Sequence, residues 1–248
     1  MEIEVLFGPA DFEVLPRRDL GDAVCVVLDV LRATTTAVTA LARGARAIRP
    51  VSTIGEAVAE RARDPEVLLA GERGGLRIRA DQAGGIDFDF GNSPREFTAE
   101  RVAGRTIVMT TTNGTRALRA AAGAGCVVAA GFLNRSAVVD YVCGLNGMRK
   151  VLVVCSGTGE ETALEDLMGA GAVVQGVVER RPELGIADSA WIALAAWRGA
   201  QPDPVAFARK SSNARRLLAM PDLAADVDFC LRCDVVERVP VMRGGELV

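Results

Sequence analysis

The sequence contains no histidine. This absence excludes a Ser-His-Asp triad, a Cys-His dyad, a histidine phosphatase and a histidine-ligated zinc site. Any acid–base chemistry must therefore use carboxylates, Lys, Tyr, Cys or metal-bound water. A metal site built from the remaining side chains would be rich in oxygen, which favours magnesium or a similar hard cation.

Aromatic residues, long apolar runs and excess positive charge are also scarce. Aromatics make up only 4% of the chain, so the core must be aliphatic. No apolar run approaches the ~20 residues of a membrane helix, and the N-terminus lacks the pattern of a signal peptide. A formal charge of -3 without a basic tract argues against a nucleic-acid partner. We therefore expect a cytoplasmic protein with neither a membrane nor a nucleic-acid partner.

The cysteines do not form a recognisable metal or redox framework. Four of the six fall in predicted strands or a predicted helix, where we expect them to be small hydrophobes in a reducing compartment. Cys230 and Cys233 form a lone CxxC. Without a second pair or a thioredoxin-like context, a zinc or redox role for this pair is not favoured.

What the sequence does contain is a repeated alternation of apolar strand, polar turn and Ala-rich helix. Half of the 248 residues are hydrophobic, enough for a sizeable core. The alternation predicts an α/β fold, a three-layer α/β/α arrangement with mainly parallel sheets. The expected strands are 3–7, 24–28, 45–51, 67–70, 106–109, 126–130, 151–155 and 235–241. The first expected helix opens at the threonines 34–36 and is ended by Gly44, and the others are 54–62, 116–122, 137–145, 163–178, 188–197 and 204–218.

Two segments of this pattern resemble each other. Residues 27–48 and 107–128 both read as strand, Thr-rich turn, Ala-rich helix and strand, which suggests two similar α/β halves. We expect residues 1–248 to form a single unit. A sub-boundary is expected in the region 76–98, which is rich in Gly, Asp and Asn and reads as a long loop.

The stretch 24–36 is where chemistry is expected first. A near-continuous apolar run, 24–28, reads as a strand buried on both faces, and Asp29 stands at its end. Arg32 and the hydroxyls of 34–36 follow at the start of a helix. In an open α/β sheet, ligands bind outside the carboxyl ends of the strands, and a helix N-terminus attracts anions.

Four such junctions are expected at one sheet edge: 32–36, 110–116, 134–136 and 156–162. Each alone is explained by Thr, Ser and Asn acting as helix N-caps. Together with two arginines they predict a pocket for a small polyanion. The candidate binding residues are Thr34, Thr35, Thr111, Thr112, Asn113, Gly114, Thr115, Arg116, Asn134, Arg135, Ser156, Gly157 and Thr158.

Carboxylates supply the other half of the predicted site. Asp29, Glu165 and Asp166 are the candidate metal ligands, and Glu72 in the turn GERGG is a further candidate for substrate binding. Acidic residues in a first helical turn are also explained by complementing the helix dipole. An alternative pair, Asp87 and Asp89 in DFDFG, resembles the DxD of haloacid-dehalogenase-type phosphatases. That pair follows a glycine-rich loop instead of an apolar strand.

In combination, these motifs resemble the 2-phosphosulfolactate phosphatase family from about residue 24 to the end of the chain. The matching motifs are DVLRATTT, GERGG, FDFGNSP, TTTNGTRA, NRSA and CSGTGEETALED, and they add Asn92 and Ser93 to the candidate substrate-binding residues. The resemblance implies magnesium-dependent hydrolysis of 2-phospho-3-sulfolactate to 3-sulfolactate and phosphate, a step towards coenzyme M. One departure is visible: relatives commonly have His-Gly before two arginines, where this chain has Asn213 and Ala214.

The predicted mechanism is metal-assisted hydrolysis of a phosphomonoester. Asp29, Arg32, Glu165 and Asp166 are the expected catalytic residues, with Mg²⁺ held by the three carboxylates. Arg32 and Arg116 would hold the charge that develops in the transition state, while the nucleophile is either water or Asp29. The expected partner is a small anionic substrate, and the sequence leaves open whether the protein forms a homodimer. The alternatives are a haloacid-dehalogenase-like phosphatase and a non-catalytic protein that binds small anions.

Overall fold

The computed structural model describes residues 2–248, and its strands form two separate sheets. Sheet A has the strand order β7-β2-β8-β1-β9, and every neighbouring pair in it is parallel. Its strands are β1 (Glu2–Leu6), β2 (Ala23–Leu28), β7 (Cys126–Ala130), β8 (Lys150–Cys155) and β9 (Gly185–Ile186).

Sheet B has the order β10-β11-β3-β6-β4-β5. Its three central strands are parallel, and its edge strands are antiparallel to their neighbours. The central strands are β3 (Ala47–Pro50), β4 (Leu68–Arg73) and β6 (Thr106–Thr110), and the edge strands are β5 (Leu76–Arg77), β10 (Met242–Arg243) and β11 (Glu246–Leu247).

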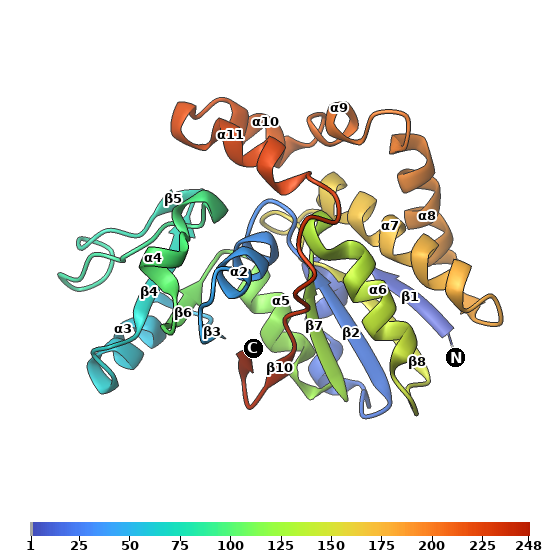
Figure 1. Cartoon of the computed structure of the whole chain (residues 1–248), viewed down its shortest axis with the longest axis horizontal. Helices are drawn as coiled ribbons and strands as arrows, with labels where there is room; N and C mark the ends of the chain where they lie inside the picture. Colours follow the sequence, from blue (N-terminus) through green and yellow to red (C-terminus); the bar gives the residue numbers. More distant parts are fainter. Residues whose placement is uncertain (1) are drawn as a thin grey trace.

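Helices α2 (Ala33–Ala42) and α5 (Gly114–Ala120) lie between the two sheets and pack in one core with both (Figure 1). They also carry the chain from one sheet to the other through a single helix each. The chain passes from β2 in sheet A through α2 to β3 in sheet B, and returns from β6 through α5 to β7. These are the two segments of similar sequence, so the similarity corresponds to a pair of matching crossovers that run in opposite directions between the sheets.

The outer face of each sheet has its own helical layer. Helices α6 (Arg135–Gly144), α7 (Leu164–Arg180) and α8 (Asp188–Ala200) cover sheet A, and α3 (Ile54–Arg63) packs on sheet B (Figure 1). Strand β2 shows why a strand of sheet A appears in the sequence as a continuous apolar run. Val24 and Val26 enter the outer core while Cys25 and Val27 enter the core between the sheets. The predicted α/β/α layering with mainly parallel strands is confirmed.

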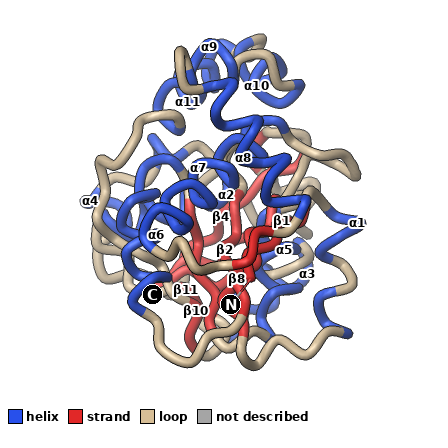
Figure 2. Tube along the Cα trace, turned by 90° about the vertical axis from the view of Figure 1, so that its right-hand side faces the viewer, coloured by secondary structure: helices blue, strands red, loops and turns tan. Residues whose placement is uncertain are grey.

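A helical cap lies above the strand ends of both sheets (Figures 1 and 2). It consists of α9 (Pro204–Ala208), α10 (Ser212–Leu218) and α11 (Pro221–Cys230). The prediction of one helix over 204–218 is wrong, because Ser211 has extended backbone angles and its hydroxyl caps a new helix by accepting from Ala214 N at 3.0 Å. The sequence reading also did not identify α11.

The predicted strand at 235–241 is wrong as well. Only Val241 forms an isolated antiparallel bridge, with Val128 of the edge strand β7. Pro240 has no N–H to donate to a ladder and only accepts from Ala129 N. The segment instead lies over the end of β7, where the N–H groups of Val235 and Val236 bond to Leu133 O.

The remaining elements are short. Helices α1 (Pro9–Phe12) and α4 (Ala99–Val102) flank the sheets, and four single turns of 3-10 helix occur at Leu15–Arg17, Pro94–Glu96, Ala121–Gly123 and Phe132–Asn134. The six cysteines are all unpaired thiols. Within residues 2–248, each helix is too short or too polar to cross a bilayer.

Candidate active site

The strand ends of both sheets open onto one cleft of about 300 Å³ between them and the cap. Strands β2, β4, β6 and β8 each deliver residues to it just after their last positions, as parallel strands should. Its lining residues are Asp29, Leu31, Arg32, Glu72, Gly74, Asn92, Thr112, Asn113, Gly157, Thr158, Gly159, Asn213 and Arg216. Eight of the sequence-predicted site residues therefore come together here, namely Asp29, Arg32, Glu72, Asn92, Thr112, Asn113, Gly157 and Thr158.

Asp29 is the carboxylate on the floor of this cleft. Its Oδ1 accepts from Ala33 N at 3.0 Å in the first turn of α2, and its own N–H donates to Thr34 Oγ1 at 2.8 Å. Its Oδ2 faces Gly114, where a larger side chain would not fit because a Cβ would lie 2.5 Å from that oxygen. Burial, together with the nearby carboxylates of Glu72 and Glu165, raises the pKa of Asp29 to about 7.

Glu165 and Asp166 begin α7 behind the cleft wall. Asp166 accepts from Val30 N at 2.8 Å and from Gly157 N at 3.0 Å, so it joins the loop after β2 to the loop after β8. Glu165 Oε1 accepts from Asn213 Nδ2 at 3.2 Å. Burial raises the pKa of Glu165, and it raises the pKa of Asp166 well above its usual range. Of the three predicted metal ligands, Asp29 is the one that lines the cleft.

Several buried oxygens around the cleft have no hydrogen-bond partner. Among residues 2–248, no three His, Cys, Asp or Glu side chains are placed to hold one metal ion by themselves. The unpartnered oxygens are Asn92 Oδ1, Asn113 Oδ1, Ser156 Oγ and Glu165 Oε2. Amide and carboxylate oxygens are the ligands that Mg²⁺ takes, and Mg²⁺ usually keeps several waters. The donor set therefore fits a hard cation held by Asp29 with amide oxygen and water.

Arg32 lies at the cleft, but both of its terminal nitrogens are already bound. One donates to Asp226 at 2.8 Å and the other to Gly75 O at 2.7 Å. Asp226 is fully buried and also accepts from Ser93 Oγ at 2.6 Å and Arg95 Nε at 2.7 Å. Arg32 and Ser93 thus belong to a network that joins the cap to both sheets, and a bond from Arg32 to the substrate stays a prediction.

Three predicted binding residues lie away from the cleft. Arg116 is ion-paired with Glu13 and with Glu160 at 3.4 Å, on the surface of α5. The side chain of Asn134 is buried and bonds to Gly131 N and Arg238 O, and Arg135 pairs with Asp234. The expectation that all four junctions share one pocket is therefore wrong for 134–136. The C-terminal segment covers the end of β7 and uses those polar groups itself.

The other predicted hydroxyls serve the local backbone. Thr34 Oγ1 donates to Ala130 O at 2.7 Å, and Thr35 Oγ1 donates to Val30 O at 2.9 Å. Thr111 and Thr115 bond to each other across the first turn of α5. These residues are buried and bond to backbone groups near the helix starts. They are not the N-caps, because the N-cap residues of α2 and α5 are Arg32 and Asn113, neither of which caps its helix with a side-chain hydrogen bond.

Asp87 and Asp89 also lie outside the cleft. Asp87 Oδ1 accepts from Ala80 N at 3.0 Å in an exposed turn, and Asp89 pairs with Arg61 and accepts from Leu69 N at 2.7 Å. Both carboxylates hold the loop beside sheet B. The haloacid-dehalogenase-like alternative gains no support from this geometry.

Two cleft residues with polar side chains, Asn213 and Arg216, were not predicted as site residues. Both come from α10 of the cap, more than 180 positions after Asp29 in the sequence. The only signal was the departure Asn213–Ala214 before two arginines. Nothing in the local pattern indicates that this helix folds back over the strand ends.

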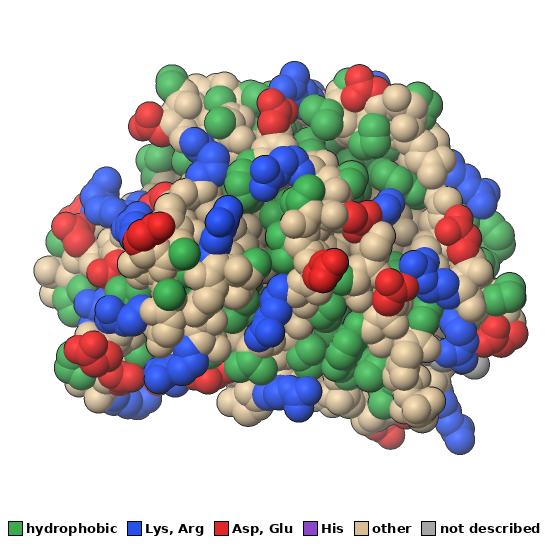
Figure 3. All heavy atoms as spheres, in the orientation of Figure 1, with side chains coloured by type: hydrophobic (Ala, Val, Ile, Leu, Met, Phe, Trp, Pro, Cys, Tyr) green, Lys and Arg blue, Asp and Glu red, His purple; other side chains and the backbone are tan. Residues whose placement is uncertain are grey.

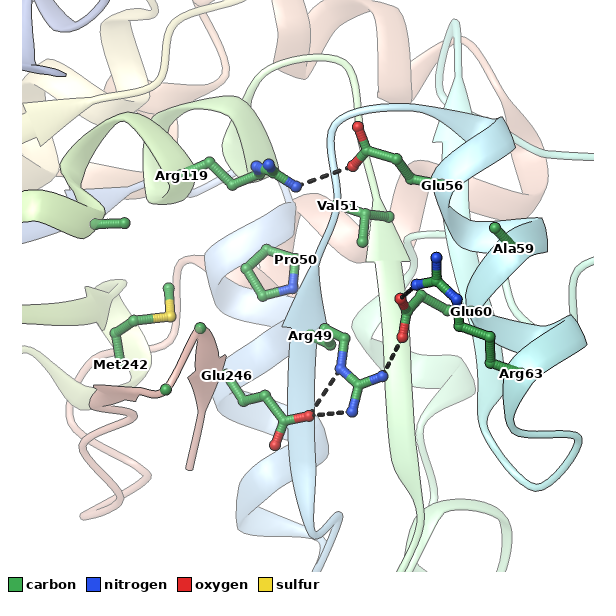
Figure 4. A pocket seen from close by; sticks show the side chains of 13 residues that line it. Arg49, Pro50, Val51, Glu56, Ala59, Glu60, Arg63, Arg119, Met242 and Glu246 are labelled. Carbon is green, nitrogen blue, oxygen red and sulfur yellow. Dashed lines mark hydrogen bonds and ion pairs between the residues drawn. The ribbon is translucent and has the colours of Figure 1, made fainter.

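A larger cavity of about 550 Å³ lies beside β3, between α3, α5 and the C-terminal hairpin (Figure 4). Acidic and basic side chains are interspersed on the face of the molecule shown in Figure 3. In the cavity beside β3, the charged side chains form ion pairs and so neutralise each other. The pairs are Arg49–Glu60, Arg49–Glu246 at 2.6 Å, Arg63–Glu60 at 2.8 Å and Arg119–Glu56 at 2.9 Å. It therefore offers little to hold a small anion.

Comparison with known proteins gives one family. A family model described as 2-phosphosulpholactate phosphatase matches residues 12–245. A protein of Carboxydothermus hydrogenoformans is 36% identical over 250 residues, covering 100% of this chain and 97% of the relative. Proteins of Thermotoga petrophila and Deinococcus radiodurans are each 40% identical, covering 96% and 94% of this chain and 97% and 93% of the relatives. All three carry the name "Probable 2-phosphosulfolactate phosphatase".

Proposed function

The chain belongs to the 2-phosphosulpholactate phosphatase family, and from that membership we propose that it is a Mg²⁺-dependent hydrolase of 2-phospho-3-sulfolactate, releasing 3-sulfolactate and phosphate. The observation that carries the proposal is the cleft between the two sheets, with Asp29 on its floor. A protein that only binds small anions would not need a buried carboxylate in the lining of its cleft, because an ionised carboxylate repels anions.

The charge balance of the cleft supports the need for a cation. Four carboxylates line it or lie directly behind it, namely Asp29, Glu72, Glu165 and Asp166. Arg32 is already neutralised by Asp226. Arg216 is then the one lining cation without a carboxylate partner among the described residues, and it alone does not balance a phosphate, a sulfonate and a carboxylate beside ionised Asp29, so a divalent cation would offset the remaining charge. Bound Mg²⁺ supplies Lewis-acid polarisation of the phosphoryl oxygens and lowers the pKa of coordinated water.

The chain's own residues would hold and orient the reacting groups. Asp29 can take a proton from an attacking water or attack phosphorus itself, and both routes need its ionised form. Asn113 donates to Ser156 O at 2.9 Å and to Gly159 O at 2.8 Å, which fixes its carboxamide at the cleft. Glu72 accepts from Thr112 N at 2.8 Å and so joins the ends of β4 and β6.

Phosphate release from 2-phosphosulfolactate tests the function directly. With Mg²⁺ we expect turnover, and with excess EDTA we expect a loss of at least about 100-fold, because metal-ion catalysis is worth several kcal/mol. Restoring Mg²⁺ should restore the rate. Unchanged turnover in EDTA would contradict the metal requirement. Binding of 3-sulfolactate without any phosphate release would favour the anion-binding alternative over the hydrolase.

We also propose a cytoplasmic location and a substrate pathway that leads towards coenzyme M. The location is supported by six unpaired cysteines, since free thiols are typical of reducing compartments. The names of the relatives support 2-phosphosulfolactate as the substrate, and the pathway is proposed from the family resemblance of the motifs.

A further inference from the structure

Arg216 faces the strand-end carboxylates from the opposite wall of the cleft. It lies on α10 of the cap and lines the cleft together with Asp29. Its guanidinium rests over Gly75, where a Cβ would lie 3.6 Å from the Cζ atom of Arg216. Gly75 has a φ of +86°, so both its backbone conformation and the neighbouring guanidinium favour glycine there.

The side chain of Asn213 holds the guanidinium in place. Asn213 is only 5% exposed, and its Nδ2 donates to Leu31 O and to Glu165 Oε1. Those two bonds orient Oδ1 towards Arg216, whose terminal nitrogen donates to it at 2.6 Å. Arg216 is thus fixed by a neutral amide and, among the described residues 2–248, forms no ion pair. Its charge is available to a ligand, unlike that of Arg32.

The position of Arg216 decides which part of a ligand it meets. Asp29 lines the cleft together with Asn92 and Asn113, whose amide oxygens have no hydrogen-bond partner and fit a cation, so we place the phosphoryl group beside Asp29. Arg216 is exposed and reaches the cleft from α10 of the cap, whereas Asp29 follows the end of β2. In the proposed substrate, the carboxylate and the sulfonate lie on the two carbons that flank the phosphorylated carbon. One of these groups must therefore project from the floor towards the cap.

We infer that Arg216 binds the anionic group of the substrate that is not transferred, and so selects phosphomonoesters with a second acidic group. The inference rests on the proposed function, which places the phosphoryl group at Asp29. A guanidinium forms two parallel hydrogen bonds with a carboxylate or a sulfonate, which a single ammonium group cannot reproduce. Arg216 is then a specificity-determining residue, and Asn213 is its positioning residue.

The test compares two secondary phosphomonoesters that differ in their flanking groups. 2-Phosphosulfolactate carries a carboxylate and a sulfonate, and glycerol 2-phosphate carries an uncharged hydroxymethyl group on each side. In Arg216→Ala, kcat/KM for 2-phosphosulfolactate should fall by about 100-fold, as expected for a lost charge-assisted bond. The fall for glycerol 2-phosphate should be at least about tenfold smaller, because no bond to a flanking anion exists there. Arg216→Lys should lie between Arg216→Ala and the wild type.

Arg215→Ala is the matched control. Arg215 is the neighbouring residue on α10, is exposed and does not line the cleft. Within residues 2–248, its side chain bonds only to Ser212 Oγ, at 3.4 Å. Its substitution should leave the ratio of the two kcat/KM values unchanged. An equal fall for both substrates in Arg216→Ala would overturn the inference, because Arg216 would then contact the phosphoryl group. The absence of any fall would overturn it as well.

Binding separates this inference from the proposed function. If the wild-type protein releases no phosphate from either compound, the proposed function fails. Calorimetric titration with 3-sulfolactate then still tests Arg216, since its alanine variant should bind at least about tenfold more weakly than Arg215→Ala. Equal affinities of the two variants would overturn the inference in that case too.

Discussion

Asp29→Asn is expected to lower kcat for phosphate release by at least about a thousandfold while making the metal-free protein more stable at pH 8. The loss of activity follows because both routes for Asp29 need a carboxylate, and an amide can neither take a proton nor attack phosphorus. The variant keeps its shape and one hydrogen-bond acceptor for Ala33 N, so the fold should persist. Phosphate release and urea unfolding of the same preparations measure the two effects.

The gain in stability follows from the sign of the pKa shift. The folded protein holds the Asp29 proton more tightly than the unfolded chain, because burial raises the pKa of Asp29 to about 7. In EDTA, the free energy of unfolding therefore falls as pH rises from about 4 to about 7, by up to about 1.4 kcal/mol per pH unit from this group. Asn has no such charge. From pH 5 to pH 8, the free energy of unfolding of the wild type should therefore fall by about 2 kcal/mol relative to that of the variant.

Asp87→Asn is the control for this prediction. Asp87 lies in an exposed turn and does not line the cleft. Its substitution should leave both turnover and the pH dependence of stability close to those of the wild type. If Asp87→Asn were inactive while Asp29→Asn retained activity, the haloacid-dehalogenase-like alternative would be correct.

Asp226→Ala should destabilise the fold by about 3–5 kcal/mol, as measured by urea unfolding with EDTA present, because it leaves the buried Arg32 cation without its partner. Asp226 is fully buried and accepts from Arg32, Ser93 and Arg95. These donors come from the start of α2 and from the loop beside sheet B, while Asp226 itself lies in α11. One carboxylate thus joins the cap to both halves of the molecule.

The control for Asp226→Ala is a second ion pair that involves helix α11. Asp228 pairs with Arg209 at 2.7 Å, and both side chains are about half exposed. Asp228→Ala should cost no more than about 1 kcal/mol, since exposed pairs contribute little. A similar loss in the two variants would contradict the role given to Asp226. An unchanged free energy of unfolding in Asp226→Ala would contradict that role as well.

The sequence predicts the strands and most helices well because burial acts on alternate residues of each strand. In β2 the side chains of Val24 and Val26 enter one core while those of Cys25 and Val27 enter the other, so the apolar run identifies a strand covered on both faces. The division into two sheets is not predictable in this way. It depends on which strands pair, and the similar sequences around α2 and α5 indicate a repeated unit without indicating that the chain changes sheets there.

The residues of the site also divide into those that local sequence predicts and those whose place depends on distant segments of the chain. Asp29, Thr112 and Asn113 were predicted because the end of a parallel strand is a local feature that fixes where a side chain must lie. Asn134 was misplaced because a segment about a hundred residues later covers the end of β7. Arg216 was missed for the converse reason, since its place depends on how the cap packs over strands from the first half of the chain.

Crystals soaked with Mn²⁺ and inorganic phosphate would test the central claim most directly, because Mn²⁺ is a hard cation with an anomalous signal that locates it. We predict one strong anomalous peak in the cleft between the two sheets, at about 2.1 Å from Asp29 Oδ2, with phosphate beside it. A peak in the cavity next to Arg49 and Glu246, or bound phosphate that makes no approach to Asp29, would contradict the account.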